Sequence, residues 1–179
     1  MTVTSPRRAP RATRATTAAP PTAAAPAPFS VFFREQAPAV AKLLAALIAR
    51  DDVEEVLQET FIAALGAYDR FDGANPRAWV LAIARRKAID EYRSRGRRPL
   101  PVADAGVDRA ATSGDPARFS AGIWAEVAGL PDKQRAAVVL RYALDLRHRE
   151  IGEVLGCSEP AARRNVHEGI AKLREKEQR

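Results

Sequence analysis

The most constraining feature of the chain is a short turn, Gly156-Cys157-Ser158, between two segments with helical apolar spacing. The apolar residues are Ile151, Val154 and Leu155 before the turn and Val166, Ile170 and Leu173 after it. Glycine adopts the left-handed backbone that ends a helix, serine caps the next helix, and Pro160 suits its first turn. The combination predicts a helix-turn-helix unit.

Two stretches of the chain lack any such pattern. Residues 1–28 are almost entirely Ala, Pro, Thr and Arg, which offer too little apolar surface to offset the entropy of ordering. Residues 97–117 contain three prolines and two glycines. We therefore expect a disordered basic tail and a flexible linker around two compact segments, 29–96 and 118–179. Neither segment alternates apolar and polar residues, which predicts an all-α protein of two small helical domains.

The apolar spacing also predicts the individual helices. In the first segment we expect helices over about 31–49, with a restart at Pro38, from Asp51 onward, and from Pro76 to about 95. In the second segment we expect helices over about 118–128 and 132–144 before the helix-turn-helix.

The net charge of +7 is unevenly distributed along the chain. Residues 1–28 carry +4, 29–72 carry −4, 73–98 carry +6, 99–129 carry −2 and 130–179 carry +3. This pattern predicts two segments that face a polyanion and one surface for a basic partner.

Several classes of protein are excluded by composition. One cysteine and two histidines cannot build a disulfide framework or a zinc site of the usual ligand count. No phosphate-binding loop or nucleophile beside a histidine occurs, so we expect no enzyme, metal or cofactor. No stretch is apolar enough to span a membrane, and we expect a cytoplasmic protein without membrane insertion.

The second helix of a helix-turn-helix unit enters the major groove, so its early non-apolar residues are the candidate DNA contacts. Those residues are Ser158, Glu159, Arg163, Arg164, Asn165 and His167. Arginine can bond guanine through two hydrogen bonds, and asparagine can do the same with adenine. The competing interpretation is the solvated face of an ordinary two-helix corner.

The segment 85–98 holds six arginines and a lysine, more than the end of a helix requires. Neighbouring rings would let bases stack while arginines hold phosphates, although the spacing of Trp79 favours a place in the core over a stacking role. The preceding helix carries a second, mostly acidic face formed by Glu55, Gln58, Glu59 and Ile62. A solvated helix end is the competing interpretation of the basic group. A solvated face is the default for the acidic one, within which the apolar Ile62 points toward a partner.

Four motifs, in order, resemble the extracytoplasmic-function (ECF) sigma factors of bacterial RNA polymerase. D-V-E-E-V-L-Q-E-T-F at 52–61 and R-A-W-V-L-A-I-A-R-R-K-A-I-D-E-Y-R at 77–93 resemble their second conserved region. L-P-D-K-Q-R at 130–135 and E-I-G-E-V-L-G-C-S-E at 150–159 resemble the fourth. The resemblance implies a transcription initiation factor that gives core polymerase its promoter specificity.

The resemblance also assigns roles to residues. It implies that 29–96 bind polymerase and recognise and melt the minus-ten element, and that 118–179 recognise the minus-thirty-five element. The implied minus-ten residues are Asp72, Asn75, Trp79, Arg85, Arg86, Lys87, Asp90 and Arg93. The implied polymerase-binding residues are Asp52, Glu55, Gln58, Glu59 and Ile62. The implied partners are the clamp helices of the largest subunit, the flap of the second-largest, promoter DNA and, without any residue that identifies it, an anti-sigma factor.

The chain departs from the family pattern at three places. Pro160 to Asn165 replace the usual Gly-Thr-Val-Lys-Ser-Arg, which alters the expected base preference. Trp79 is followed by Val80 instead of a second aromatic residue, which predicts weaker strand opening. Gly152 stands where the family commonly has alanine, and glycine costs the helix about 1 kcal/mol relative to alanine. This departure suggests that two helices pack closely there.

Two other functions remain compatible with these residues. A helix-turn-helix regulator would bind an operator without polymerase, with residues 29–96 sensing a signal or forming a dimer. An adaptor would use the same basic helices to bind acidic proteins. The acidic helix followed by the arginine-rich one favours the sigma factor over both.

Overall fold

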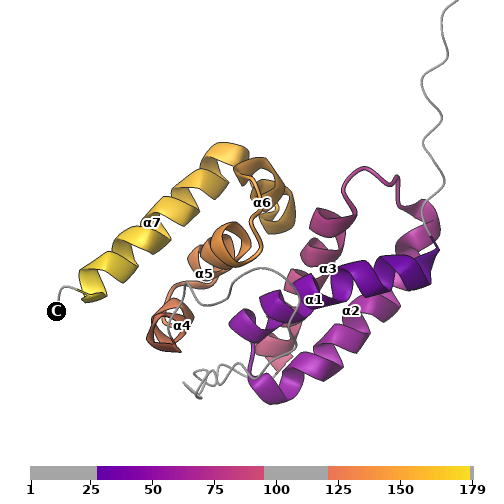
Figure 1. The fold of residues 1–179 in the computed structure, drawn as a ribbon, viewed down its shortest axis with the longest axis horizontal. Coiled ribbons are helices and arrows are strands. Elements are labelled where there is room, and N and C mark those ends of the chain that lie inside the picture. The colour runs from indigo at the N-terminus through magenta and orange to yellow at the C-terminus, as the bar shows by residue number, and fades with distance from the viewer. Residues whose placement is uncertain (1–27, 95–120, 178–179) are drawn as a thin grey trace, which may run out of the picture.

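The computed structural model describes residues 28–94 and 121–177, and every regular element in these ranges is helical (Figure 1). The predicted all-α class is therefore confirmed for the described residues. Apart from Pro28, the predicted tail over 1–28 and linker over 97–117 lie outside them.

The first helical unit contains three long helices, joined by short 3₁₀ turns and a loop. They are α1 (Phe29–Leu47), η1 (Arg50–Asp52), α2 (Val53–Ala67), η2 (Tyr68–Arg70) and α3 (Pro76–Ser94). The second unit begins with two short helices and ends with the long α7, which lies at the outer edge in Figure 1. Its elements are α4 (Ala121–Ala128), α5 (Asp132–Val138), the π-helical turn η4 (Val139–Ala143), α6 (His148–Leu155) and α7 (Glu159–Glu177).

Pro38 does not restart α1, as the sequence predicts, but lies inside one continuous helix. Its ring removes one N–H, so the carbonyl oxygen of Arg34 loses its usual helical partner. Because Pro38 and Arg34 are both exposed, water can bond that oxygen. A solvent-facing proline is therefore tolerated where a core-facing one would break the helix.

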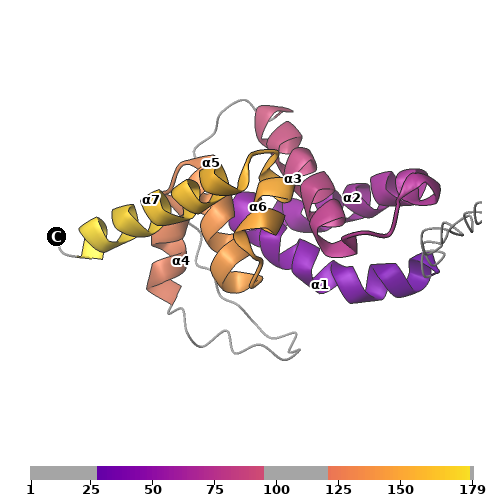
Figure 2. The ribbon, with the colours of Figure 1, turned by 90° about the horizontal axis from the view of Figure 1, so that it is seen from above.

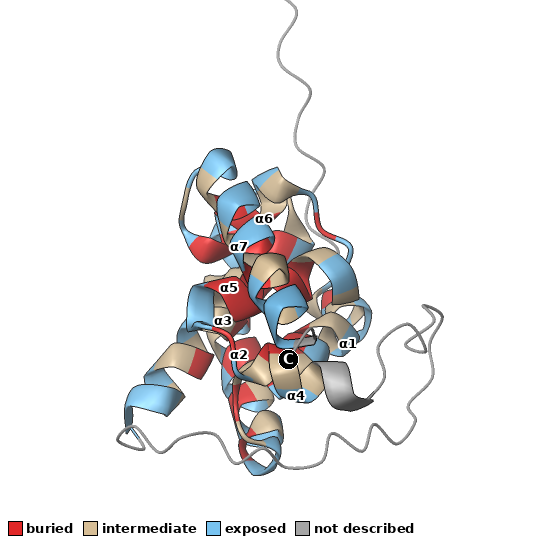
Figure 3. Ribbon diagram, turned by 90° about the vertical axis from the view of Figure 1, so that its left-hand side faces the viewer, coloured by how far each residue is buried: buried red, intermediate tan, exposed pale blue. Residues whose placement is uncertain are grey.

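The core of the first unit has an aliphatic part and an aromatic part. Val40, Leu43 and Leu44 of α1 and Val80 and Leu81 of α3 are fully buried. The aromatic part gathers Phe29, Phe32, Phe61, Tyr68, Phe71 and Trp79. Figure 3 shows buried residues gathered where the helices face each other and exposed ones on the outer surfaces. These rings position the loop that leads into α3.

The helix-turn-helix turn has the predicted geometry. Gly156 adopts the left-handed conformation, with φ 65° and ψ 43°, and ends α6. The backbone N–H of Ala161 donates to Ser158 Oγ at 3.4 Å, so Ser158 caps α7. A Cβ on Gly152 would lie 2.7 Å from the carbonyl oxygen of Cys157, which confirms the close packing expected there.

The two units contact each other through α1 and α3 on one side and α4, α5, η4 and α6 on the other (Figures 1 and 2). Arg77 Nη2 donates to the carbonyl oxygen of Leu144 at 2.9 Å, and Lys42 Nζ donates to that of Ala143 at 3.5 Å. A cleft of about 840 Å³ between α1, α3 and α5 lies at the same boundary.

Candidate nucleic-acid interface

The first half of α7 presents an exposed basic face. Arg163, Arg164 and His167 are exposed, and so are Ser158 and Glu159 at the start of the helix. The N-terminus of a helix favours anions, because its N–H groups point outward and the helix dipole is positive there. This face can therefore hold phosphate oxygens and offer arginines to base edges.

Neighbouring acids turn the two arginines in opposite directions along α7. Arg163 Nη2 lies 3.3 Å from Glu159 Oε1, one turn toward the N-terminus. Arg164 Nε lies 3.9 Å from Glu168 Oε1, one turn toward the C-terminus. Both pairs are largely exposed, so each contributes little to folding and can yield to a phosphate or a base.

Asn165 is less available than the sequence predicts. Its side chain is half-buried, and Nδ2 donates to the carbonyl oxygen of Ala161 at 2.8 Å. A bidentate contact with adenine would require this donor to leave its own helix.

The loop before α3 is held by its own polar side chains. Asp72 Oδ1 accepts from the N–H of Ala74 at 2.9 Å, and Gly73 supplies the left-handed residue with φ 77°. Asn75 Oδ1 accepts from the N–H of Ala78 at 3.1 Å and caps α3, while Asn75 Nδ2 donates to Glu153 Oε2 of α6 at 3.1 Å. Both ends of the Asn75 amide are therefore engaged within the protein.

The basic residues of α3 do not share one free face. Arg86 and Arg93 are exposed, and Arg93 Nη1 lies 3.9 Å from Asp90 Oδ1. Arg85 instead lines the cleft together with Asp132, and burial lowers the pKa of its guanidinium below its ordinary value although Asp132 opposes the shift. Arg85 is thus half-buried between the units, unlike the exposed position that a cationic outer face predicts.

Trp79 is half-buried and packs against other rings. Its ring is stacked on Phe71, with centroids 4.5 Å apart and planes 22° apart, and meets Phe32 at 5.8 Å. This geometry matches the core interpretation of Trp79 and leaves only part of the ring for a stacked base.

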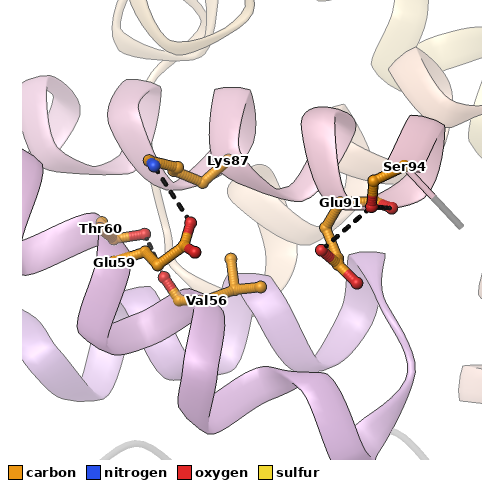
Figure 4. A network of polar contacts seen from close by, with 6 residues as sticks. All are labelled: Val56, Glu59, Thr60, Lys87, Glu91 and Ser94. Carbon is orange, nitrogen blue, oxygen red and sulfur yellow. Dashed lines mark hydrogen bonds and ion pairs between the residues drawn. The ribbon is translucent and has the colours of Figure 1, made fainter.

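The acidic helix α2 presents Glu55 and Gln58 to solvent, followed by Ile62 with 71% of its surface exposed. Glu59 differs, because its Oε2 lies 3.0 Å from Lys87 Nζ of α3 (Figure 4). Asp52 is only 5% exposed and does not belong to this face, since it ends η1 against the core.

Residues 32–98 match the family model of Sigma-70 region 2, and residues 121–173 match that of Sigma-70, region 4. The chain is 36% identical over 137 residues to the ECF RNA polymerase sigma factor ShbA of Streptomyces griseus, a match that covers 70% of this chain and 72% of ShbA. The chain belongs to the ECF sigma factors. It directs promoter-specific transcription initiation with RNA polymerase and is not an enzyme.

The chain is also similar to other sigma factors. The ECF sigma factor SigE of Mycolicibacterium smegmatis is 30% identical over 132 residues, which cover 69% of this chain and 51% of SigE. Among solved structures, CnrH in complex with the cytosolic domain of CnrY is 28% identical with a TM-score of 0.64, covering 84% of this chain and 87% of that one. RpoE in complex with the anti-sigma factor NepR from Bartonella quintana is 25% identical with a TM-score of 0.66, covering 82% and 94%.

In this sigma factor, the structure brings together residues that the sequence treats separately. Leu65, 56% exposed, lies three residues after Ile62 on α2 and extends the same exposed face, a position that helical spacing alone could have indicated. Glu153 lies within the motif at 150–159, but its contact with Asn75 could not be read from that motif. Glu168 lies in none of the four motifs and becomes relevant through its contacts with Gln134 and Arg164. The described residues contain no cluster of three or more metal-ligating side chains and no helix long and apolar enough to cross a membrane.

Proposed function

We propose that this sigma factor reads the minus-thirty-five element with the first half of α7. The observation that carries the proposal is the exposed basic face of Arg163, Arg164 and His167, which directly follows a glycine-ended turn and a serine cap. An exposed helix of this kind fits the major groove. Its arginines can bond to base edges, and its N-terminus can bind a phosphate. Ser158 and Glu159 belong to the same end of the helix, and Asn165 joins them only if its amide leaves Ala161.

The loop from Asp69 to Asn75 and helix α3 form the proposed minus-ten surface. Arg86 and Arg93 are exposed for phosphate contacts, and Asp72, Lys87 and Asp90 lie on the same elements. Arg85, Asn75 and Trp79 belong to the surface as well, although each is engaged within the protein here. Their use by DNA therefore requires exchange of an internal contact for a contact with the promoter.

Helix α2 is the proposed docking surface for the clamp helices of the largest polymerase subunit. Glu55, Gln58, Ile62 and Leu65 form an exposed face that combines acidic, polar and apolar groups, which suits a basic partner with an apolar centre. Glu59 extends this face when Lys87 releases it. The flap of the second-largest subunit is the proposed partner of the second unit.

Polymerase is needed because each DNA surface alone is small. Few base contacts and much phosphate charge give weak, salt-sensitive binding. Polymerase would hold both units at a fixed spacing, so that two weak sites act at a high effective concentration. The chain would then act in the cytoplasm, where polymerase and promoters are.

Retention of core RNA polymerase by the immobilised full chain tests this function. We expect the wild type to retain polymerase. A Glu35→Ala control, which removes an exposed acid of α1, should retain it as well. A variant combining Glu55→Ala, Gln58→Ala and Ile62→Ala should lose retention. The purified holoenzyme should then produce discrete transcripts from a fragmented-genome template pool, and the triple variant should not.

The opposite result is equally informative. Sequence-specific DNA binding by the chain alone, with equal polymerase retention by the triple variant, would contradict the assignment of α2.

An anti-sigma partner is proposed only by kinship, because CnrH and RpoE are known in complexes with CnrY and NepR.

A further inference from the structure

A buried amide on α5 forms a hydrogen bond with an acidic residue of α7. Gln134 is 8% exposed, and its Nε2 donates to Glu168 Oε2 of α7 at 2.8 Å. Among the described residues the amide oxygen Oε1 has no partner, so the bond to Glu168 is the one hydrogen bond that this side chain makes there. A carboxylate can only accept, which fixes the amide with its NH₂ group toward Glu168.

The backbones of α5 and α7 approach closely at the same place. Gly169 follows Glu168 and is buried. A Cβ added to Gly169 would lie 2.7 Å from Val138 Cγ2 and 3.4 Å from the carbonyl oxygen of Gln134. The donor and the acceptor are therefore carried by two tightly packed helices, and their separation is set by the core.

The second oxygen of the same carboxylate faces an arginine of the proposed DNA surface. Glu168 Oε1 lies 3.9 Å from Arg164 Nε. An exposed ion pair usually contributes little, in part because two long side chains must be ordered together. Here Gln134 has already ordered the acid, so only Arg164 has rotamer freedom left to lose.

We propose that Glu168, anchored by Gln134, is a positioning residue that selects the conformation in which Arg164 meets the minus-thirty-five element and thereby sharpens base preference at the position Arg164 contacts. The proposal rests on the proposed function of α7. It distinguishes the two adjacent arginines. Glu159, the partner of Arg163, is exposed and is bonded to no buried donor in the described part of the chain.

The test uses the reconstituted holoenzyme and a promoter library in which each minus-thirty-five position is varied in turn. Arg164→Ala should reduce the preference at one or two positions by about 5-fold to 150-fold, the range for loss of a bidentate base contact. Glu168→Gln keeps an acceptor for Gln134 but removes the charge beside Arg164. It should reduce preference at the same positions by about two- to fivefold, in line with an ion pair of this kind.

Two further variants separate positioning from general effects. Glu175→Gln removes another exposed acid of α7 and should change transcription from all library members alike. Glu168→Gln should add nothing to the preference profile when combined with Arg164→Ala, because there is no arginine left to position. Gln134→Met, which keeps the buried volume but removes the donor, should reproduce the profile of Glu168→Gln.

The preference profiles test the role of Arg164 and the role of Glu168 separately. An unchanged preference profile for Arg164→Ala would contradict the proposed role of Arg164 and, with it, the positioning role of Glu168. If Arg164→Ala alters the profile as expected but Glu168→Gln behaves like Glu175→Gln, base reading stands and the positioning role is wrong. The same holds if Glu168→Gln changes the profile equally with and without Arg164.

Discussion

Lys87 Nζ lies 3.0 Å from Glu59 Oε2, so an ion pair joins the helix proposed to dock on polymerase to the helix proposed to contact the promoter. Both side chains are partly exposed, at 34% for Lys87 and 49% for Glu59. Neither group can serve an external partner fully without releasing the other. The pair thus couples two surfaces that the sequence presents as independent.

The strength of this pair can be measured by a double-mutant cycle. Urea unfolding of Glu59→Ala, Lys87→Ala and the double variant should give a coupling free energy of about 0.2–1 kcal/mol, because solvent screens a pair this exposed. The combination of Glu55→Ala with Lys87→Ala is the matched control and should be additive. A coupling equal to that of the control would mean that the pair contributes nothing to folding.

Gly152→Ala should destabilise the second unit even though alanine is the better helix former. The new Cβ would lie 2.7 Å from the carbonyl oxygen of Cys157, a backbone atom that cannot rotate away. Overpacking of this kind typically costs about 1–3 kcal/mol against a propensity gain of about 1 kcal/mol, so we expect a net loss of up to about 2 kcal/mol. The measurement is the free energy of unfolding in urea.

Gly66→Ala provides the control for that experiment. Gly66 is also helical, but a Cβ there would meet nothing within 4 Å. The free energy of unfolding should rise by up to about 1 kcal/mol. Equal effects of the two substitutions would show that the close approach at Gly152 does not constrain the turn.

Asn75→Asp should separate the two units without removing the cap of α3. Aspartate caps a helix as well as asparagine does, but its carboxylate would face Glu153 where Asn75 Nδ2 now donates. We expect a larger radius of gyration in small-angle X-ray scattering of the full chain. Adding Glu153→Gln should restore the wild-type value, and identical values for all three proteins would argue against this contact in solution.

Trp79→Ala tests whether this ring serves the core or the promoter. Loss of its packing against Phe71 and Phe32 should lower the free energy of unfolding by about 3 kcal/mol, and Trp79→Phe should lose less. Urea unfolding and promoter opening by the holoenzyme would be measured together. Normal stability combined with lost promoter opening would instead make Trp79 a stacking platform.

Local features of the fold could be predicted from the sequence because they depend on neighbouring residues. Gly156, Ser158 and Pro160 specify the end of α6 and the start of α7 through backbone conformation and capping. Pro38 was the local exception, since its effect depends on which face of α1 meets the core. That face is known only once the other helices are placed.

Contacts across the chain could not be predicted in this way. Arg85 has the sequence context of an exposed basic residue, yet α5 packs beside it and burial lowers its pKa. Asn75 and Glu153 are 78 residues apart, and neither belongs to a pattern that includes the other. Their meeting depends on how the two helical units pack against each other, which apolar periodicity does not encode.

The hydrogen bond from Asn75 to Glu153 would compete with the promoter for the same amide if Asn75 belongs to the minus-ten surface as proposed. The closed state, in which Asn75 is bonded to Glu153, and the DNA-bound state would then be mutually exclusive. Closure with an equilibrium constant K would raise the apparent dissociation constant for the promoter by a factor of 1 + K. A value of K near 10 would weaken promoter binding by roughly 1.4 kcal/mol. Polymerase would recover that free energy by holding the units apart, so that occupancy of the promoter would report on assembly with polymerase as well as on DNA sequence.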